Sequence, residues 1–291
     1  MFPVLIDLGF FKIYTFGVFL VLAFFWGTFL LWRNIRLTSF KEEDVFDGLF
    51  ISMASGFIVG RLLYVIFNFN QFGFDILKYI LINGYPGLSL FGSVVGAALG
   101  LYIFFLIKKI KFFDIVDYFI TPGLLALGLG KIGSFFSGVE VGTKTKFFLA
   151  IKYAGFDGFR HLTALYEGFL FIIGAYLSYK LLFGIRRQKY AKGFNFYFFW
   201  WYLGLVYFLF DPLKSAHLTF ITTDSLNKTF SLAILLTFTF YFLYYFRSSI
   251  LGKIQIIKNS IYFYGQKTIS RVYKTTGKKI KGDKDKNTSK D

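Results

Sequence analysis

Among the ionisable side chains that interrupt or border apolar stretches of this 291-residue sequence, five stand out as candidates for a site: Arg61, Lys131, His161, Glu167 and Asp211. Arginine and lysine bind phosphate through charge-assisted hydrogen bonds, and backbone N–H groups of glycine-containing turns add further donors. Because Lys131 stands within a glycine-rich segment, the sequence predicts a site for a phosphate or a similar anionic group.

The composition indicates that the elements positioning these residues lie mostly in lipid. Apolar residues make up 56% of the chain and charged residues only 17%, against about 25% in soluble domains. The chain has no cysteine and two histidines, which excludes disulfides, thiolate nucleophiles, iron–sulfur clusters and a histidine-rich metal site. We therefore expect an integral membrane protein without a metal or other cofactor.

Seven segments are apolar and long enough, or nearly so, to cross a bilayer as a helix, which takes about 20 residues. They are 13–32, 48–67, 87–107, 115–137, 163–183, 194–210 and 229–246. Lys12 is the only early cation, so the first segment is expected to be a transmembrane helix and not a cleavable signal peptide. The fourth is the weakest, because Pro122 and several glycines disfavour an uninterrupted helix. The expected fold is an all-α bundle of about seven transmembrane helices.

The cations between these segments predict the orientation of the bundle. They concentrate in 33–41, in 108–111, in 186–192 and beyond residue 246, and by the positive-inside rule these parts face the cytoplasm. The N-terminus is then outside and the C-terminus cytoplasmic. The basic segment 143–160 is an exception to the rule, since it falls on the outer side.

The composition also divides the chain into a transmembrane domain, residues 1–246, and a basic cytoplasmic tail, residues 247–291. The last ~20 residues of the tail are low in complexity and are expected to be disordered. Its positive charge predicts attraction to anionic inner-leaflet lipid. No nucleic-acid-binding motif accompanies the charge, so we expect no nucleic-acid partner.

With this orientation, the five ionisable residues named above gather in the outer half of the bilayer, whereas Asp114 and Asp117 lie near its cytoplasmic face. A cationic pocket at this depth suits an anionic lipid headgroup. The alternative is that each residue snorkels to the interface or belongs to a structural ion pair, such as Arg61 with Glu167.

The glycine-rich segment, residues 122–142, allows two interpretations. Its glycines stand at 123, 128, 130, 133, 138 and 142. Small residues permit close packing of membrane helices. In a non-helical turn they instead let the backbone approach a ligand. The composition favours neither interpretation.

Five short blocks follow one another along the chain. They are GRLLYV at 60–65, GLSLFGS at 87–93, GKIGSFFSG at 130–138, HLTALYE at 161–167 and the polar positions of 207–214. In these blocks, their order and the expected topology, residues 1–246 resemble the prolipoprotein diacylglyceryl transferase family.

This resemblance implies transfer of a diacylglyceryl group from phosphatidylglycerol to the lipobox cysteine of a prolipoprotein, at the outer face of the bacterial cytoplasmic membrane. The nucleophile arrives on the substrate, which agrees with a chain that has no cysteine. We expect His161 to act as the base, oriented by Glu167 or Tyr166. The residues expected to hold the phosphatidylglycerol headgroup are Arg61, Lys131, Gly133, Ser134, Gly138, Gly142 and Asp211.

Several positions depart from the pattern of the family. The signature arginine and asparagine are Lys131 and Ser134 here, and the family histidine of the second block, thought to transfer a proton, is Phe91. Phenylalanine cannot titrate, so the alternative function is a catalytically degenerate protein that binds lipid or lipoprotein. A transporter is a third interpretation, although no internal repeat supports it.

Overall fold

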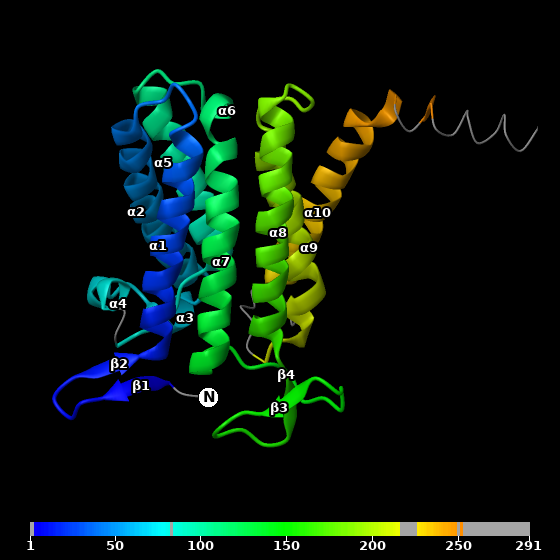
Figure 1. Ribbon diagram of the computed structural model, residues 1–291. Coiled ribbons are helices and arrows are strands. Elements are labelled where there is room, and N and C mark those ends of the chain that lie inside the picture. The colour runs from blue at the N-terminus through cyan, green and yellow to red at the C-terminus, as the bar shows by residue number, and fades with distance from the viewer. Residues whose placement is uncertain (1–2, 82–83, 216–225, 249–250, 253–291) are drawn as a thin grey trace, which may run out of the picture. The chain divides into compact units, whose positions relative to one another are not determined.

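The structure is a computed structural model that describes residues 3–81, 84–215, 226–248 and 251–252. This part contains seven helices that are long and apolar enough to span a membrane. They are α1 (Thr15–Ile35), α2 (Glu42–Phe67), α5 (Leu90–Ile107), α7 (Asp117–Ser137), α8 (Thr163–Arg186), α9 (Phe194–Phe210) and α10 (Leu226–Tyr245) (Figure 1). The predicted all-α membrane fold is confirmed, and the orientation of its termini stays a prediction.

Shorter elements connect the long helices. They are β1 (Val4–Asp7), β2 (Lys12–Tyr14), α3 (Phe69–Phe72), α4 (Ile76–Ile80), α6 (Phe112–Ile115), β3 (Ala150–Lys152), β4 (Phe159–His161) and the 3₁₀ turn η1 (Asp211–Leu213). Strands β1 and β2 form one antiparallel hairpin, and β3 and β4 form another. Both hairpins lie at the end of the bundle where α1 begins and α7 ends (Figure 1). The sequence did not predict these strands, which are only three or four residues long.

Helix α7 is central to the packing, because it contacts α1, α8 and α9. Gly128 of α7 faces Gly168 of α8, and a Cβ added to either glycine would lie 3.1 Å from the carbonyl oxygen of the other. A Cβ on Gly133 would lie 2.4 Å from the Cβ of Phe19 in α1. These glycines therefore permit close helix packing, the first of the two interpretations of the segment.

The helix also continues through Pro122, so the predicted fourth span, 115–137, is confirmed. Pro122 lies near the beginning of α7, which runs on for fifteen more residues and ends at Ser137. Gly138 then adopts a left-handed conformation with φ of +73°, a common way to end a helix. The chain leaves the helix at this point and enters the candidate site.

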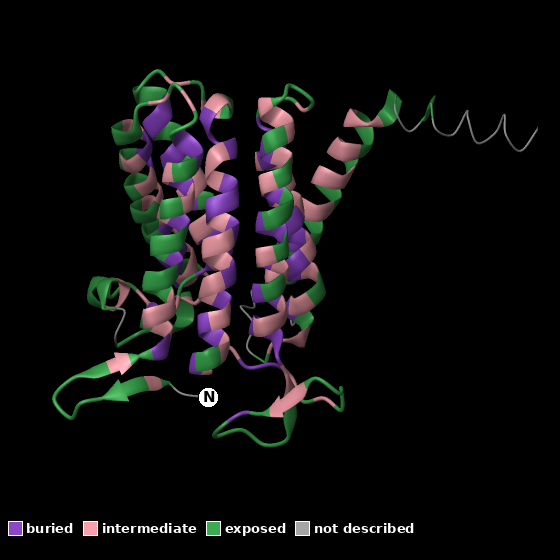
Figure 2. Ribbon diagram, in the orientation of Figure 1, coloured by how far each residue is buried: buried purple, intermediate pink, exposed green. Residues whose placement is uncertain are grey.

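Many of the residues that the long helices leave exposed, green in Figure 2, are large and apolar. Val21, Phe25 and Ile58 each leave more than half of their surface uncovered. Such faces suit hydrocarbon as the surrounding solvent. The backbone groups suit it as well, because an α-helix satisfies its own backbone hydrogen bonds. The interior between α7, α8 and α9 is filled by side chains that include Leu124, Phe171 and Leu203.

The chain divides into two compact units, residues 1–238 and residues 239–291. The first unit holds every residue of the site described below. The last turns of α10, which ends at Tyr245, belong to the second unit. The predicted disorder of the last ~20 residues falls outside the described part of the chain.

Candidate functional site

The chain after α7 returns toward the helix ends and forms a short ladder with two other segments. Thr143 donates its N–H to the carbonyl of Leu213 at 2.8 Å, and Ser215 donates to the carbonyl of Val141 at 3.0 Å. On the other side, the N–H of His161 in β4 reaches the carbonyl of Thr143 at 3.1 Å. The ladder thereby brings the ends of α7 and α9 and the beginning of α8 to one place.

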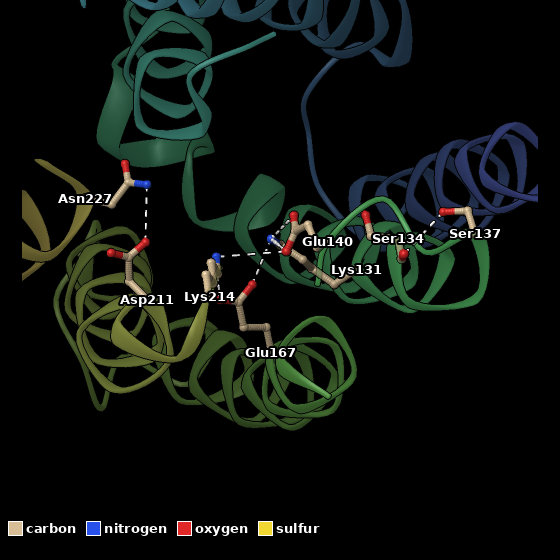
Figure 3. Close-up of polar contacts among 8 residues, drawn as sticks. All are labelled: Lys131, Ser134, Ser137, Glu140, Glu167, Asp211, Lys214 and Asn227. Carbon is tan, nitrogen blue, oxygen red and sulfur yellow. Dashed lines mark hydrogen bonds and ion pairs between the residues drawn. The ribbon is translucent and has the colours of Figure 1, made fainter. Parts of the chain in front are cut away.

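Four charged side chains meet there, and we call them the ionic cluster: Lys131, Glu140, Glu167 and Lys214 (Figure 3). The Lys131 Nζ lies 2.6 and 2.8 Å from the two carboxylate oxygens of Glu140 and 2.7 Å from Oε2 of Glu167. The Lys214 Nζ lies 2.7 Å from Oε1 of Glu167 and 3.9 Å from Oε2 of Glu140. Glu167 thus joins both lysines, and the cluster as a whole is electrically neutral.

The cluster is buried unevenly. The side chain of Glu167 is fully covered, those of Lys131 and Lys214 are 8% and 11% exposed, and that of Glu140 is 30% exposed. The ring of Tyr207 lies 5.5 Å from the Lys131 ammonium and 4.6 Å from that of Lys214, within cation–π range. Opposite charges and an aromatic face together hold two buried cations at the end of the bundle.

Glu140 lies outside the membrane-spanning segments, and its environment keeps it charged. Burial alone raises the pKa of the Glu140 carboxyl, but the ammonium groups of Lys131 and Lys214 outweigh burial and hold that pKa below its ordinary value. Glu140 is therefore a carboxylate at neutral pH.

A pocket of about 290 Å³ opens beside the cluster. It is lined by Val139, Glu140, Val141, Phe156, Lys214 and Ser215. Two of these residues belong to the ionic cluster, so a molecule in the pocket meets one carboxylate and one ammonium directly. The arrangement can bind an anionic group and can accept a proton.

Arg61, by contrast, is engaged with the loop around α4. Its Nε donates to the carbonyl of Tyr79 at 2.9 Å, and its two terminal nitrogens donate to the carbonyls of Lys78 and Gly87, each at 2.8 Å. Glu167 pairs with Lys131 and Lys214, so the alternative that coupled it to Arg61 was wrong. Three of the five N–H groups of the guanidinium hold one loop together.

The glycine and serine positions of the predicted headgroup site have different surroundings. Gly133 and Ser134 lie inside helix α7, where backbone N–H groups bond within the helix. Gly138 ends that helix. Gly142 approaches β4 so closely that an added Cβ would lie 2.4 Å from the carbonyl oxygen of His161. Of these four residues, Ser134 is the one with a polar side chain, and it is buried one turn after Lys131.

His161 lies in β4, next to the ladder. Its Nδ1 is buried without a hydrogen-bond partner among the described residues, and its ring lies 6.0 Å from that of Phe147. Its carbonyl accepts a hydrogen bond from the hydroxyl of Tyr153 at 3.3 Å, and burial raises the pKa of Tyr153 to about 12. Tyr153 therefore stays a hydrogen-bond donor at neutral pH, and His161 serves the ladder through its backbone.

Tyr166 and Asp211 are held by other groups near the cluster. The Tyr166 hydroxyl donates to the carbonyl of Leu149 at 2.9 Å. Asp211 is buried and accepts a hydrogen bond from the side chain of Asn227 at 3.3 Å (Figure 3). The structure thus brings Lys131 and Glu167 together and gives the remaining predicted residues other partners.

Two members of the cluster were absent from the predicted set, Glu140 and Lys214. Both lie in connecting segments, and the segments meet only through the ladder of backbone hydrogen bonds. The available signal was a charge within three residues of the end of an apolar span, which both residues show. Phe91, where the resemblance expected a histidine, is buried with its ring 5.2 Å from that of Tyr207.

Comparison with known proteins agrees with the resemblance seen in the sequence. The family model described as prolipoprotein diacylglyceryl transferase matches residues 3–247. Among curated relatives, a protein of Fusobacterium nucleatum is 31% identical over 146 residues, which cover 49% of each chain. One of Clostridioides difficile is 30% identical over 153 residues, 52% of this chain and 60% of the relative.

A protein of Desulfotalea psychrophila matches over a larger share, 32% identical over 193 residues, 65% of this chain and 70% of the relative. All three bear the name phosphatidylglycerol–prolipoprotein diacylglyceryl transferase. The aligned part of the chain spans about half to three fifths of the first two relatives.

Proposed function

The chain belongs to the prolipoprotein diacylglyceryl transferase family, and we propose that it moves a diacylglyceryl group from phosphatidylglycerol to the lipobox cysteine of a prolipoprotein. The names of the relatives support the two substrates and the type of reaction. The observation that carries the proposal in this chain is the ionic cluster beside a pocket, at the end of a multi-pass membrane bundle.

The chemistry of phosphatidylglycerol fits this site. Its headgroup is a phosphodiester with one negative charge, which the pocket can receive at the ammonium of Lys214, with Lys131 directly behind. The hydroxyl of Ser134 lies one turn after Lys131 and can add a donor. The bundle supplies apolar faces for the acyl chains.

Two cations also match the charge that develops in the reaction. The substrate sulfur forms a bond to the glyceryl carbon of the lipid, and the bond from that carbon to the phosphate oxygen breaks. Glycerol phosphate leaves with additional negative charge on that oxygen. Positive groups that already face the leaving oxygen stabilise this change without first having to reorganise.

We assign supporting roles to the other predicted residues. Arg61 fixes the loop around α4 through three carbonyls. Gly138 and Gly142 shape the turn and the ladder that position Glu140, and Gly133 sets the spacing of α7 to α1. Asp211 and Tyr166 hold the ends of α9 and α8 in place. Glu167 holds both lysines in place, because each of its carboxylate oxygens pairs with one of them.

We further propose that the protein lies in the bacterial cytoplasmic membrane with the ionic cluster toward the outside. The basic segments 33–41, 108–111 and 186–192 support this orientation by the positive-inside rule. The basic tail from residue 247 then faces anionic lipid of the inner leaflet. A secreted prolipoprotein would meet the site on the side from which its mature part emerges.

The substitution of Phe91 for the family histidine favours a second candidate, a protein that binds lipid without turnover. Phe91 is buried against Tyr207, next to the cluster, and contributes no titratable group. This candidate keeps the headgroup site and lacks proton transfer.

One assay separates the two candidates. The purified full chain is placed in vesicles of phosphatidylglycerol with a peptide that carries a lipobox cysteine, and the peptide is followed by mass. We expect the peptide to gain the mass of a diacylglyceryl group while glycerol phosphate is released. Saturable binding of phosphatidylglycerol with no mass gain, beside an active relative as the control, would establish the second candidate instead.

A further inference from the structure

The two lysines of the ionic cluster differ in how many carboxylate oxygens lie close to their ammonium groups. An ammonium group has three N–H donors, and three carboxylate oxygens lie within 2.8 Å of the Lys131 Nζ. The Lys214 Nζ has one carboxylate oxygen at 2.7 Å and a second at 3.9 Å. A phosphate that enters the pocket can therefore accept a hydrogen bond from the Lys214 ammonium, whereas the three N–H donors of Lys131 already face carboxylate oxygens.

A phosphate can reach Lys131 only if one carboxylate withdraws. The neutral cluster would otherwise acquire a buried negative charge without a partner, which is costly in a low-dielectric environment. Glu167 is fully covered, lies on helix α8 and bridges both lysines. Glu140 is 30% exposed, lies on a connecting segment after a left-handed turn and lines the pocket. Glu140 is the carboxylate that can leave.

Resting on the function proposed above, we propose that Glu140 is a displaceable counter-ion and the catalytic base of this chain. The lipid phosphate takes the place of the Glu140 carboxylate on Lys131, one negative charge for another. The released carboxylate remains in the wall of the pocket and accepts the proton of the substrate thiol.

The step balances in atoms and charge. The proton moves from sulfur to a carboxylate oxygen of Glu140, the sulfur lone pair forms the bond to the glyceryl carbon, and the carbon–oxygen bond to phosphate breaks. Glu140 then holds the proton and the leaving phosphate carries the charge. Transfer of that proton to the phosphate and departure of glycerol phosphate let Glu140 return to Lys131.

The charged surroundings of Glu140 explain why binding of the lipid would activate it. Lys131 and Lys214 lower the pKa of its carboxyl, whereas burial raises it. A phosphate on the lysines removes much of their influence and leaves the burial in place, so the pKa rises. Among the described residues, the other titratable groups around Glu140 and its lysines are Glu167, Tyr153 and Tyr207.

Geometry favours Glu140 over His161, the base expected from the sequence. Glu140 is the carboxylate among the six residues that line the pocket, and His161 is not among them. The Nδ1 of His161 is buried beside the ring of Phe147, and its backbone is engaged in the ladder. A base at Glu140 also accounts for a chain in which phenylalanine occupies position 91.

The test compares two nucleophiles in the full chain in phosphatidylglycerol vesicles. Glu140→Gln is assayed with a lipobox peptide that carries cysteine and with one that carries selenocysteine, whose selenol is ionised at neutral pH. Because a general base contributes about 10²–10⁴-fold, we expect a loss of at least about 100-fold with cysteine. We expect most of that loss to be recovered with selenocysteine, which needs no base.

Lys131→Gln is the matched comparison, since it removes the phosphate partner and leaves the base. We expect it to lose activity equally with both peptides. Glu140→Asp should recover part of the cysteine rate, and a single cooperative thermal transition shows that each variant folds. His161→Gln should keep the ratio of the two rates found in the wild type.

The outcomes separate this inference from the proposed function. Equal losses with both peptides in Glu140→Gln, or no loss at all, would overturn the role of Glu140 while an active wild type still upholds the transferase. An inactive wild type on both peptides would overturn the transferase itself, and the role of Glu140 with it.

Discussion

Helix α7 carries a buried charge near each end, and the two are held in different ways. Near its beginning, the Asp117 carboxylate accepts hydrogen bonds from the backbone N–H groups of Gly193 at 2.6 Å and Phe196 at 3.0 Å. Asn195 completes the contact by donating to the Asp117 carbonyl at 3.1 Å. Near its end, Lys131 is held by carboxylate side chains beside a pocket.

The difference lies in what each charge can exchange. Asp117 binds the first turn of α9, where a negative charge also meets the positive end of the helix dipole. Its partners are backbone groups of a rigid helix, and they cannot leave without unfolding that turn. The partners of Lys131 are side chains, and one of them is partly exposed to the pocket. A buried charge by itself therefore indicates a structural role. A buried charge beside a pocket, with partners that can be displaced, indicates a functional site.

The largest expected effect separates Lys131 from an ordinary surface lysine. Lys131→Gln should lower the rate of diacylglyceryl transfer by about 10²–10³, the usual cost of removing one preorganised group that stabilises the leaving charge. Lys192→Gln is the control, because it breaks an exposed ion pair with Asp114 near the other end of α7. Both rates are measured by peptide mass and normalised to folded protein. A similar loss in the two variants would remove the distinction between the ends of α7.

Arg61 should behave like Asp117, because its hydrogen bonds also go to backbone groups. Lysine cannot supply three donors in the geometry of a guanidinium, so Arg61→Lys should lower the free energy of unfolding by about 1–3 kcal/mol. The melting temperature in detergent or vesicles measures this effect. The transfer rate per folded molecule should change far less than in Lys131→Gln. A rate loss of comparable size without a change in melting temperature would place Arg61 at the substrate.

Position 91 offers a direct comparison with the family pattern. Phe91→His places a polar ring in a buried apolar position beside Tyr207 and should cost about 1–3 kcal/mol of stability. If Glu140 is the base, the added imidazole should change the transfer rate by less than about threefold. A gain of tenfold or more would show that this chain lacks a group that the family supplies at this position.

The smallest expected effect concerns the stability of the protein at acidic pH. Because the pKa of Glu140 is lower in the folded protein than in the unfolded chain, its contribution to stability is complete at neutral pH. That contribution disappears as the pH falls through the folded-state pKa, which lies below the ordinary pKa of a glutamate carboxyl. The melting temperature of the wild type should therefore fall toward that of Glu140→Gln as the pH is lowered past the ordinary glutamate pKa of about 4.3. A gap between the two that stays constant down to pH 3 would contradict the ion pair.

The sequence predicted the spans and part of the site for one physical reason, the cost of polarity in lipid. Each of the seven apolar segments corresponds to one long helix, and the helix ends lie within six residues of the expected ends. Lys131 and Glu167 stood out because they are charges inside such segments, and the structure joins them at 2.7 Å. These properties can be read locally along the chain.

The remaining features depend on contacts between distant segments. Glu140 and Lys214 meet because backbone hydrogen bonds join Val141 and Thr143 to residues 213–215, and neither segment shows this alone. Arg61 and Lys131 look alike in the sequence, each a cation in an apolar segment. Only the fold shows that one faces backbone carbonyls and the other faces carboxylates.

Two buried carboxylates test the central claim most directly: Glu167 of α8, which pairs with Lys131 of α7, and Asp117 of α7 itself. Each can be replaced by an amide of the same shape. We would measure diacylglyceryl transfer by Glu167→Gln and by Asp117→Asn, per folded molecule, in the same vesicles. Glu167→Gln removes the group that positions both lysines and should lower the rate by about 100-fold or more. Asp117→Asn should lose stability but keep the rate within about threefold of the wild type. Equal losses of rate in the two variants would contradict the assignment of the ionic cluster as the site.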